Sequence, residues 1–160
     1  MPAVYILLGV QGSGKSTWAQ ANAAKLSAEV VSSDAIRNEL ESQGRRADAA
    51  NGDVVFAIFN ARLERMLLDG KDVIADATHA RKTWREPAAR TARRLGAKII
   101  GVWFDVPLAV CLQRNAARPG GGWGDRVVPE EFLIEVAKGF EKPEEGEFDE
   151  VWKIVNGWNG

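Results

Sequence analysis

Short apolar runs alternate along this chain with longer segments whose apolar residues recur at helical spacing. Apolar residues fill the first and fourth runs almost throughout, which is typical of strands buried on both faces of a parallel sheet. The pattern therefore predicts five strands, at Ala3–Leu8, Glu29–Ser32, Asp72–Asp76, Ala97–Phe104 and Glu150–Val155.

The segments between these runs predict helices. Strands that alternate with helices indicate an α/β fold, and right-handed crossovers bring the strands into one parallel sheet. We expect five strands in the order 2-3-1-4-5, sandwiched by helices, with a break at residues 43–46 and a late start or kink caused by Pro87. The predicted helices run from the first loop to about Leu26, from Ala35 to about Ser42, over Asp53–Leu68 and Lys82–Leu95, from Pro107 to about Ala117, and from Pro129 to about Phe140.

The first strand leads into a glycine-rich stretch that fits the phosphate-binding loop G-x-x-x-x-G-K-[ST] at every fixed position. Its glycines let the backbone curl with the N–H groups inward, which forms a nest for phosphate oxygens. Lys15 is expected to reach the β- and γ-phosphates of ATP, and the Ser16 hydroxyl to take part in a Mg²⁺ site. The predicted nucleotide-binding residues of this stretch are Gly9, Gln11, Gly12, Ser13, Gly14, Lys15, Ser16 and Thr17.

Length and charge narrow the range of functions. The 160 residues predict a single domain, and the net charge of −1 gives no indication of a strong duplex-DNA or membrane-surface binder. The single Cys111 excludes an internal disulfide and is expected to be a small buried hydrophobe, as in a cytoplasmic protein. We expect no membrane span, no structural zinc site and no obligate protein partner, and a packing role for most of the six Trp residues.

Charged residues follow the second strand, where a parallel sheet gathers its ligand site. Asp34 and Arg37 are three residues apart at a helix start and therefore share one helical face. Asp34 is a candidate to accept the proton of an incoming hydroxyl, and Arg37 to hold charge on the acceptor. The alternative is that Asp34 only caps the helix and Arg37 lies in solvent.

The third strand ends on Asp76, which is followed closely by Thr78 and His79. Asp76 is placed either to hold Mg²⁺ through water or to orient Arg37 by a bidentate pair, and the sequence leaves both open. Thr78 and His79 are candidates to contact the acceptor or a metal-bound water. For His79, a base and a neutral hydrogen-bonding histidine are equally compatible with the sequence.

Arg114 and Arg118 share a helix face before the glycine-rich loop Pro119–Gly124. This arrangement predicts a lid over residues 114–128 whose arginines close on the nucleotide, with Arg126 a weaker candidate. A solvated basic helix end is the alternative. The segment around the fourth helix is denser in basic residues than the rest of the chain, which fits either a solvated face or a surface that follows a nucleic-acid strand; the residues are Arg81, Lys82, Arg85, Arg90, Arg93, Arg94 and Lys98.

Taken together, these motifs resemble the 5′-hydroxyl polynucleotide kinases and the wider group of small P-loop kinases around them. The resemblance covers essentially the whole chain and rests on an ordered set of motifs: residues 9–18, Asp34-x-x-Arg37, Asp76-x-Thr78, residues 104–107, Arg114-Asn115-x-x-Arg118 and Val128-Pro129. Two departures from that family are notable: the 160 residues contain no stretch that matches the phosphatase domain or the oligomer-forming tail of the phage enzyme, and the glycine-rich lid insertion Gly120–Gly124 is longer than expected.

The resemblance implies a role for each matched position. Asp34 would be the general base on the 5′-hydroxyl, and Arg37 would bind a 3′-phosphate of the acceptor. Asp76 would support Arg37 or the metal water. Arg118 would engage the donor phosphates, and Arg114 would be a lid residue. We therefore expect an ATP- and Mg²⁺-dependent kinase acting on a hydroxyl, best identified as the 5′-hydroxyl of a single-stranded polynucleotide. The alternatives are a kinase of small-molecule alcohols and an ATP-binding regulator that phosphorylates nothing.

Overall fold

The five predicted strands form one sheet in the order β2-β3-β1-β4-β5, and every pairing between neighbours is parallel. The computed structural model describes residues 1–120 and 126–155. The predicted strand order is confirmed. The strands are β1 Ala3–Leu8, β2 Ala28–Ser32, β3 Asp72–Asp76, β4 Lys98–Asp105 and β5 Glu150–Val155.

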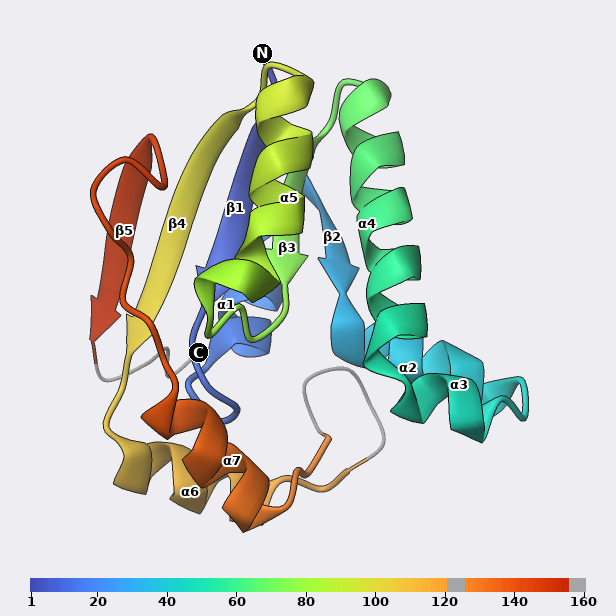
Figure 1. Cartoon of the computed structure of the whole chain (residues 1–160), viewed down its shortest axis with the longest axis vertical. Helices are drawn as coiled ribbons and strands as arrows, with labels where there is room; N and C mark the ends of the chain where they lie inside the picture. Colours follow the sequence, from blue (N-terminus) through green and yellow to red (C-terminus); the bar gives the residue numbers. More distant parts are fainter. Residues whose placement is uncertain (121–125, 156–160) are drawn as a thin grey trace.

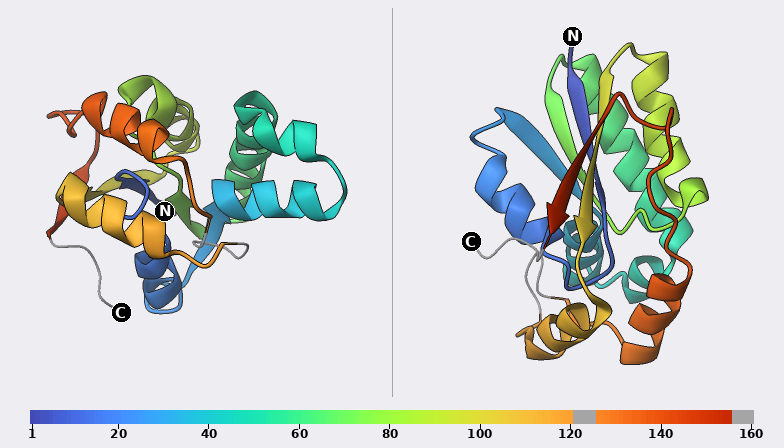
Figure 2. Two further views of the ribbon diagram at one scale, coloured as in Figure 1. Left: turned by 90° about the horizontal axis from the view of Figure 1, so that it is seen from below. Right: turned by 90° about the vertical axis from the view of Figure 1, so that its left-hand side faces the viewer.

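The helices cover both faces of this sheet and its carboxyl edge (Figure 1). Helices α4 and α5 lie on one face, and α1 lies on the other, as the edge-on view in Figure 2 shows. Helices α2, α3, α6 and α7 gather where the strands end. The bounds are α1 Lys15–Asn22, α2 Ser33–Ser42, α3 Arg46–Ala50, α4 Gly52–Leu68, α5 Lys82–Arg94, α6 Leu108–Ala117 and α7 Glu130–Lys138.

Strand β1 has two buried faces because successive side chains point to opposite sides of the sheet. Val4, Ile6 and Leu8 pack with Phe59 and other apolar residues of α4 and α5. Tyr5 and Leu7 pack in a second core with Trp18 of α1. The continuous apolar run that predicted a central parallel strand therefore serves two separate cores.

Two helix boundaries differ from the predictions. Helix α1 ends at Asn22 rather than near Leu26, because residues 23–27 form turns and Ser27 takes a left-handed backbone with φ 51°. The break expected at residues 43–46 is shorter than predicted, since α3 begins at Arg46, where the Arg45 side chain pairs with Asp48 at 2.7 Å.

Helix α5 runs over Lys82–Arg94 with Pro87 inside it, so the late start considered for this helix does not occur. A proline at this position removes one backbone hydrogen bond of the helix. Across residues 1–120 and 126–155, no helix is both long and apolar enough to cross a bilayer.

Candidate functional site

The phosphate-binding loop joins β1 to α1 and depends on backbone conformations that favour glycine. Gly12 and Gly14 have φ values of 83° and 100°. A side-chain carbon on Gly12 would also lie 2.4 Å from the carbonyl oxygen of Cys111 on α6. The loop is therefore held tightly against α6, and Gly12 is required by both conformation and space.

Lys15 begins α1 and is buried against the loop, where its Nζ donates a hydrogen bond of 2.9 Å to the Val10 carbonyl. Burial, helped by the charge of Arg118, lowers the pKa of Lys15 to about 8 against the opposing charges of Asp76 and Asp34. These mutual influences mean that Lys15 shares its surroundings with Asp76, Arg118 and Asp34. A desolvated ammonium in this position suits the binding of an anion.

Ser16 and Asp76 meet where β3 ends. The Ser16 hydroxyl donates a hydrogen bond of 2.8 Å to Oδ2 of Asp76. A hydroxyl beside a buried carboxylate gives the oxygen ligands that Mg²⁺ prefers, so these residues fit that metal and would hold it, in part through water. The contact leaves both roles considered for Asp76 open, the metal site and the orientation of Arg37.

Two buried polar atoms of the loop lack hydrogen-bond partners within residues 1–120 and 126–155. They are the Ser13 hydroxyl and Oε1 of Gln11. Buried polar groups are nearly always paired, and unpaired ones call for a specific explanation. The two unpaired atoms lie in the same glycine-rich loop as Lys15 and Ser16. Together these groups fit a polyphosphate ligand such as the triphosphate of ATP.

Asp34 lies in the first turn of α2 but does not cap this helix. The cap is Ser32, whose hydroxyl accepts a hydrogen bond of 3.2 Å from the Ala35 amide. The interpretation of Asp34 as a mere N-cap is therefore wrong. Burial lowers the pKa of Arg37, against the charge of Asp34, so the two side chains lie within electrostatic reach of each other.

Thr78 and His79 follow β3 and have different environments. The Thr78 hydroxyl accepts a hydrogen bond of 3.2 Å from the Gln11 side chain. His79 is buried, and its Nδ1 lies 2.8 Å from the Leu7 carbonyl, so Nδ1 carries the proton. Burial lowers the pKa of His79 to about 4, which makes the neutral histidine the form present near pH 7.

Side chains at the end of α6 hold the segment 126–129 over the site. The Asn115 amide pairs with both the N–H and the carbonyl of Val128, at 3.0 and 2.8 Å. Arg118 donates to the Arg126 carbonyl at 2.8 Å, and the Arg126 guanidinium contacts Glu41 of α2 at 3.1 Å. The predicted lid is thus linked to the helix that carries Asp34; its residues 121–125 lie outside the described part of the chain.

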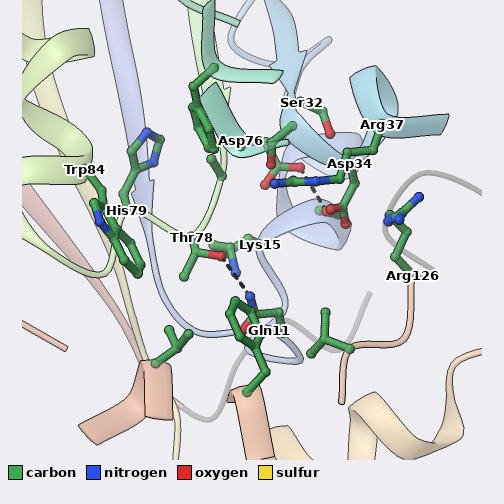
Figure 3. Close-up of a pocket in the computed structure, with 18 of the residues that line it drawn as sticks. Gln11, Lys15, Ser32, Asp34, Arg37, Asp76, Thr78, His79, Trp84 and Arg126 are labelled. Atoms are coloured by element: carbon green, nitrogen blue, oxygen red, sulfur yellow. Dashed lines mark hydrogen bonds between the residues drawn. The ribbon is translucent and has the colours of Figure 1, made fainter. Parts of the chain in front are cut away.

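One chamber of about 790 Å³ connects these elements. Figure 3 shows Trp84 and His79 on one side of it, Asp34, Arg37 and Arg126 on the other, and Lys15 with Gln11 and Thr78 between them. Of the predicted site residues, the lining includes Gln11, Lys15, Ser16, Asp34, Arg37, Asp76, Thr78, His79 and Arg118.

The other predicted residues lie around the chamber rather than in its lining. Gly9 packs close to Ser13 and Phe104, Thr17 is exposed on α1, and Arg114 donates to the Gly12 carbonyl at 3.4 Å. Arg114 therefore supports the loop from α6.

Several residues of the chamber lining were not predicted from the sequence. Phe56 and Asn60 come from α4, Thr83, Trp84 and Pro87 from α5, and Phe132 and Val136 from α7. Trp84 and Phe132 are 44% and 50% exposed, so Trp84 does not have the packing role expected of most tryptophans. The sequence carries one signal for Trp84 and Phe132: each is an aromatic residue in a helix whose buried face is already occupied by other residues.

Acidic partners occupy most of the basic residues in and around α5. Arg85 is buried and makes a bidentate pair with Glu147 at 2.8 and 2.9 Å. Five others pair with acids on the surface: Lys82 with Glu144, Arg90 and Arg93 with Glu86, Arg94 with Glu64, and Lys98 with Glu150. This pattern favours a structural role over a surface that follows a nucleic-acid strand.

Fold and loop together define a P-loop NTPase of the kind found in small kinases. The chain belongs to the family described as AAA domain, whose sequence pattern matches residues 4–143. Comparison with curated protein sequences finds no match.

Solved structures agree on the fold at low sequence identity. A provisionally assigned kinase from Chloroflexus aurantiacus matches with a TM-score of 0.78 and 17% identity, over 98% of this chain and 89% of that one. The gluconokinase of Sinorhizobium meliloti matches with a TM-score of 0.64 and 19% identity, over 96% and 82%. Kti12 of Chaetomium thermophilum, solved with ADP-AlF3, matches with a TM-score of 0.67 and 14% identity, over 96% and 89%.

Proposed function

We propose that this chain is an ATP-dependent phosphotransferase that moves the γ-phosphate to a hydroxyl group. The observation that carries the proposal is the convergence of Lys15, the Ser16–Asp76 pair and Asp34 on one chamber. A protein that only binds nucleotide needs Lys15 and the Ser16–Asp76 pair. It does not need the carboxylate of Asp34 in the first turn of α2. Residues 1–160 act in this proposal as one kinase unit with a lid at 114–128.

The donor half of the site binds ATP through the loop amides and Lys15. Bound Mg²⁺ would neutralise charge that develops on the phosphates. Arg118 reaches the same chamber and would stabilise the transferring phosphoryl group. The buried Lys15 needs no large movement, since it already lies at the loop.

The acceptor half positions the attacking oxygen. The acceptor hydroxyl gives its proton to the carboxylate of Asp34 as its oxygen bonds to the γ-phosphorus. The bond between that phosphorus and the β–γ bridging oxygen breaks, and ADP leaves. Arg37, close to Asp34, is suited to hold negative charge on the acceptor.

A small alcohol is the acceptor class that we favour over a polynucleotide. Six of the seven basic residues in and around α5 are paired with carboxylates, which leaves little free charge for phosphates of a strand. A polynucleotide 5′-hydroxyl is the second candidate, supported by the motif resemblance and by Arg37 beside Asp34.

Transfer of labelled γ-phosphate tests the proposal. The untagged chain is incubated with ATP and Mg²⁺, and with a panel of small alcohols or a short 5′-hydroxyl oligonucleotide. Asp34→Asn is expected to lower the transfer rate about 10²- to 10⁴-fold while nucleotide affinity is kept. Asp69→Asn, an exposed acid at the end of α4, serves as the matched control. Hydrolysis of ATP that is indifferent to every alcohol and to Asp34→Asn would refute the proposal.

A further inference from the structure

Exposed apolar side chains from three separate elements line the chamber. Trp84 of α5, Val127 of the lid segment and Phe132 of α7 are 44%, 52% and 50% exposed, and all three belong to its lining. Phe56 and Pro87 add to this apolar part of the lining, the apolar wall. A single exposed hydrophobe needs no explanation, but several that meet on one cavity indicate a ligand surface.

The chamber has two ends of different chemistry. The charged residues Lys15, Asp34 and Arg37 lie toward the phosphate-binding loop and α2, and Trp84 lies on the opposite side (Figure 3). Asn60 and Thr83 add neutral polar groups to the lining. An acceptor that places its hydroxyl at Asp34 therefore has its remaining part against an aromatic surface.

The position of Trp84 suits stacking. The Arg81 guanidinium carbon lies 5.4 Å from the centre of the indole ring, a cation–π contact that covers one face and limits its rotation. The residue still exposes 44% of its surface. A planar group that stacks on such a ring gains both apolar burial and a favourable ring contact.

A ring-free polyol is a poor match for this wall. Each hydroxyl that a polyol loses from water needs a hydrogen-bond partner, and an unpaired one weakens binding. The wall offers apolar carbon at most positions. The volume of about 790 Å³ is large enough for a ring system in addition to the reacting groups.

We propose that the acceptor is an alcohol that carries a flat aromatic ring, bound with the ring against Trp84 and the hydroxyl at Asp34. The inference rests on the proposed function and specifies its acceptor. The shared chemistry, a hydroxyl joined to a ring, occurs in nucleosides and in other aromatic alcohols.

Three probes separate these possibilities: thymidine, 2-phenylethanol and D-gluconate. Their steady-state kcat and KM are measured with saturating ATP and Mg²⁺, and their binding is measured by saturation-transfer NMR with Asp34→Asn and ATP. We expect at least one ring-bearing probe to bind and to be phosphorylated, with gluconate the weakest. The better of thymidine and 2-phenylethanol identifies the source of the ring.

Substitutions of Trp84 test the contact itself. Trp84→Leu is expected to raise KM for the ring-bearing probe roughly 5- to 100-fold with kcat little changed, as loss of one stacking contact implies. Trp84→Phe restores most of the affinity, since it returns a ring. Leu68→Ala removes an exposed apolar side chain at the end of α4, away from the chamber lining, and is expected to change neither kcat nor KM.

The outcomes separate the inference from the proposed function. Ring-dependent binding that needs Trp84 but gives no phosphoryl transfer refutes the kinase proposal and supports the ring subsite. Transfer to gluconate that exceeds transfer to both ring probes, with no effect of Trp84→Leu, overturns the ring subsite and keeps the kinase. Failure of both ring probes to bind also overturns it.

Discussion

The single histidine of the chain makes its stability at mildly acidic pH a direct test of the buried site. His79 is the only residue whose ordinary pKa lies between 5 and 7. It is 3% exposed and donates from Nδ1 to the Leu7 carbonyl. The centre of its ring lies 6.0 Å from the centre of the Phe59 ring. Lys15 and Arg85 add positive charge around it, so burial and both cations lower its pKa to about 4.

The sign and size of the effect follow from proton linkage. In the unfolded chain His79 takes up a proton as the pH falls below 6.5, whereas in the folded chain it does so only near pH 4. The unfolded state therefore binds more protons in this window, and the folded state loses stability as the pH falls. The free energy of unfolding is expected to drop by about 2 kcal/mol between pH 7 and pH 5.

Urea unfolding of the untagged chain at pH 7, 6 and 5 measures this change. The control is His79→Asn, because asparagine tolerates the left-handed backbone at this position, with φ 47°, and its amide can donate to Leu7. The variant loses packing against Phe59 and is expected to be less stable at pH 7, but to show little further loss down to pH 5. A decline of equal size in both proteins, or a flat curve for the wild type, would refute the assignment.

Two further predictions concern Lys15 and the pair Arg85–Glu147. Because the pKa of Lys15 is about 8, its ammonium loses the proton between pH 7 and pH 9, and the affinity for ATP is expected to fall about tenfold over this range. The affinity is measured by calorimetry without Mg²⁺ or acceptor, and Lys15→Met is expected to bind weakly at every pH. A constant affinity in the wild type would contradict this. Burial raises the pKa of Glu147, but the hydrogen bonds with Arg85 outweigh burial, and the net pKa of Glu147 is lowered. Glu147→Gln is therefore expected to lower the free energy of unfolding in urea by about 3 kcal/mol. The exposed Glu145→Gln is the control and is expected to lower it by less than about 0.5 kcal/mol. An equal cost in the two variants would show that the pair is not specific.

Strands were predicted more accurately than helix ends, and the reason is physical. A central parallel strand such as β1 must be apolar on both faces, and few other structures require that pattern. The ends of α1 and the presence of α3 depend on local contacts instead. The turn after Asn22 and the Arg45–Asp48 pair are weak signals in sequence, because turns and short helices draw on the same residue types.

The donor half of the site was predictable because it is built from backbone. The loop needs glycine at positions such as Gly12, where a side chain would meet the Cys111 carbonyl, and this requirement leaves a motif of fixed spacing. The acceptor half is assembled from side chains of four elements that are far apart in sequence, from Asp34 to Phe132. Asp34 and Arg37 were predicted from their place after β2, but no spacing rule links them to Trp84 or Phe132, so only the fold brings these residues to one chamber.

The two halves of the site also depend on the core to different degrees. The loop, Lys15 and the Ser16–Asp76 pair depend on β1, α1 and the end of β3, which are fixed by the core. Trp84 and Phe132 are exposed on helix surfaces and lie outside that core, whereas Phe56 packs against it. We therefore expect a substitution of Trp84 to change the acceptor preference of the proposed kinase and to leave its affinity for nucleotide unaltered.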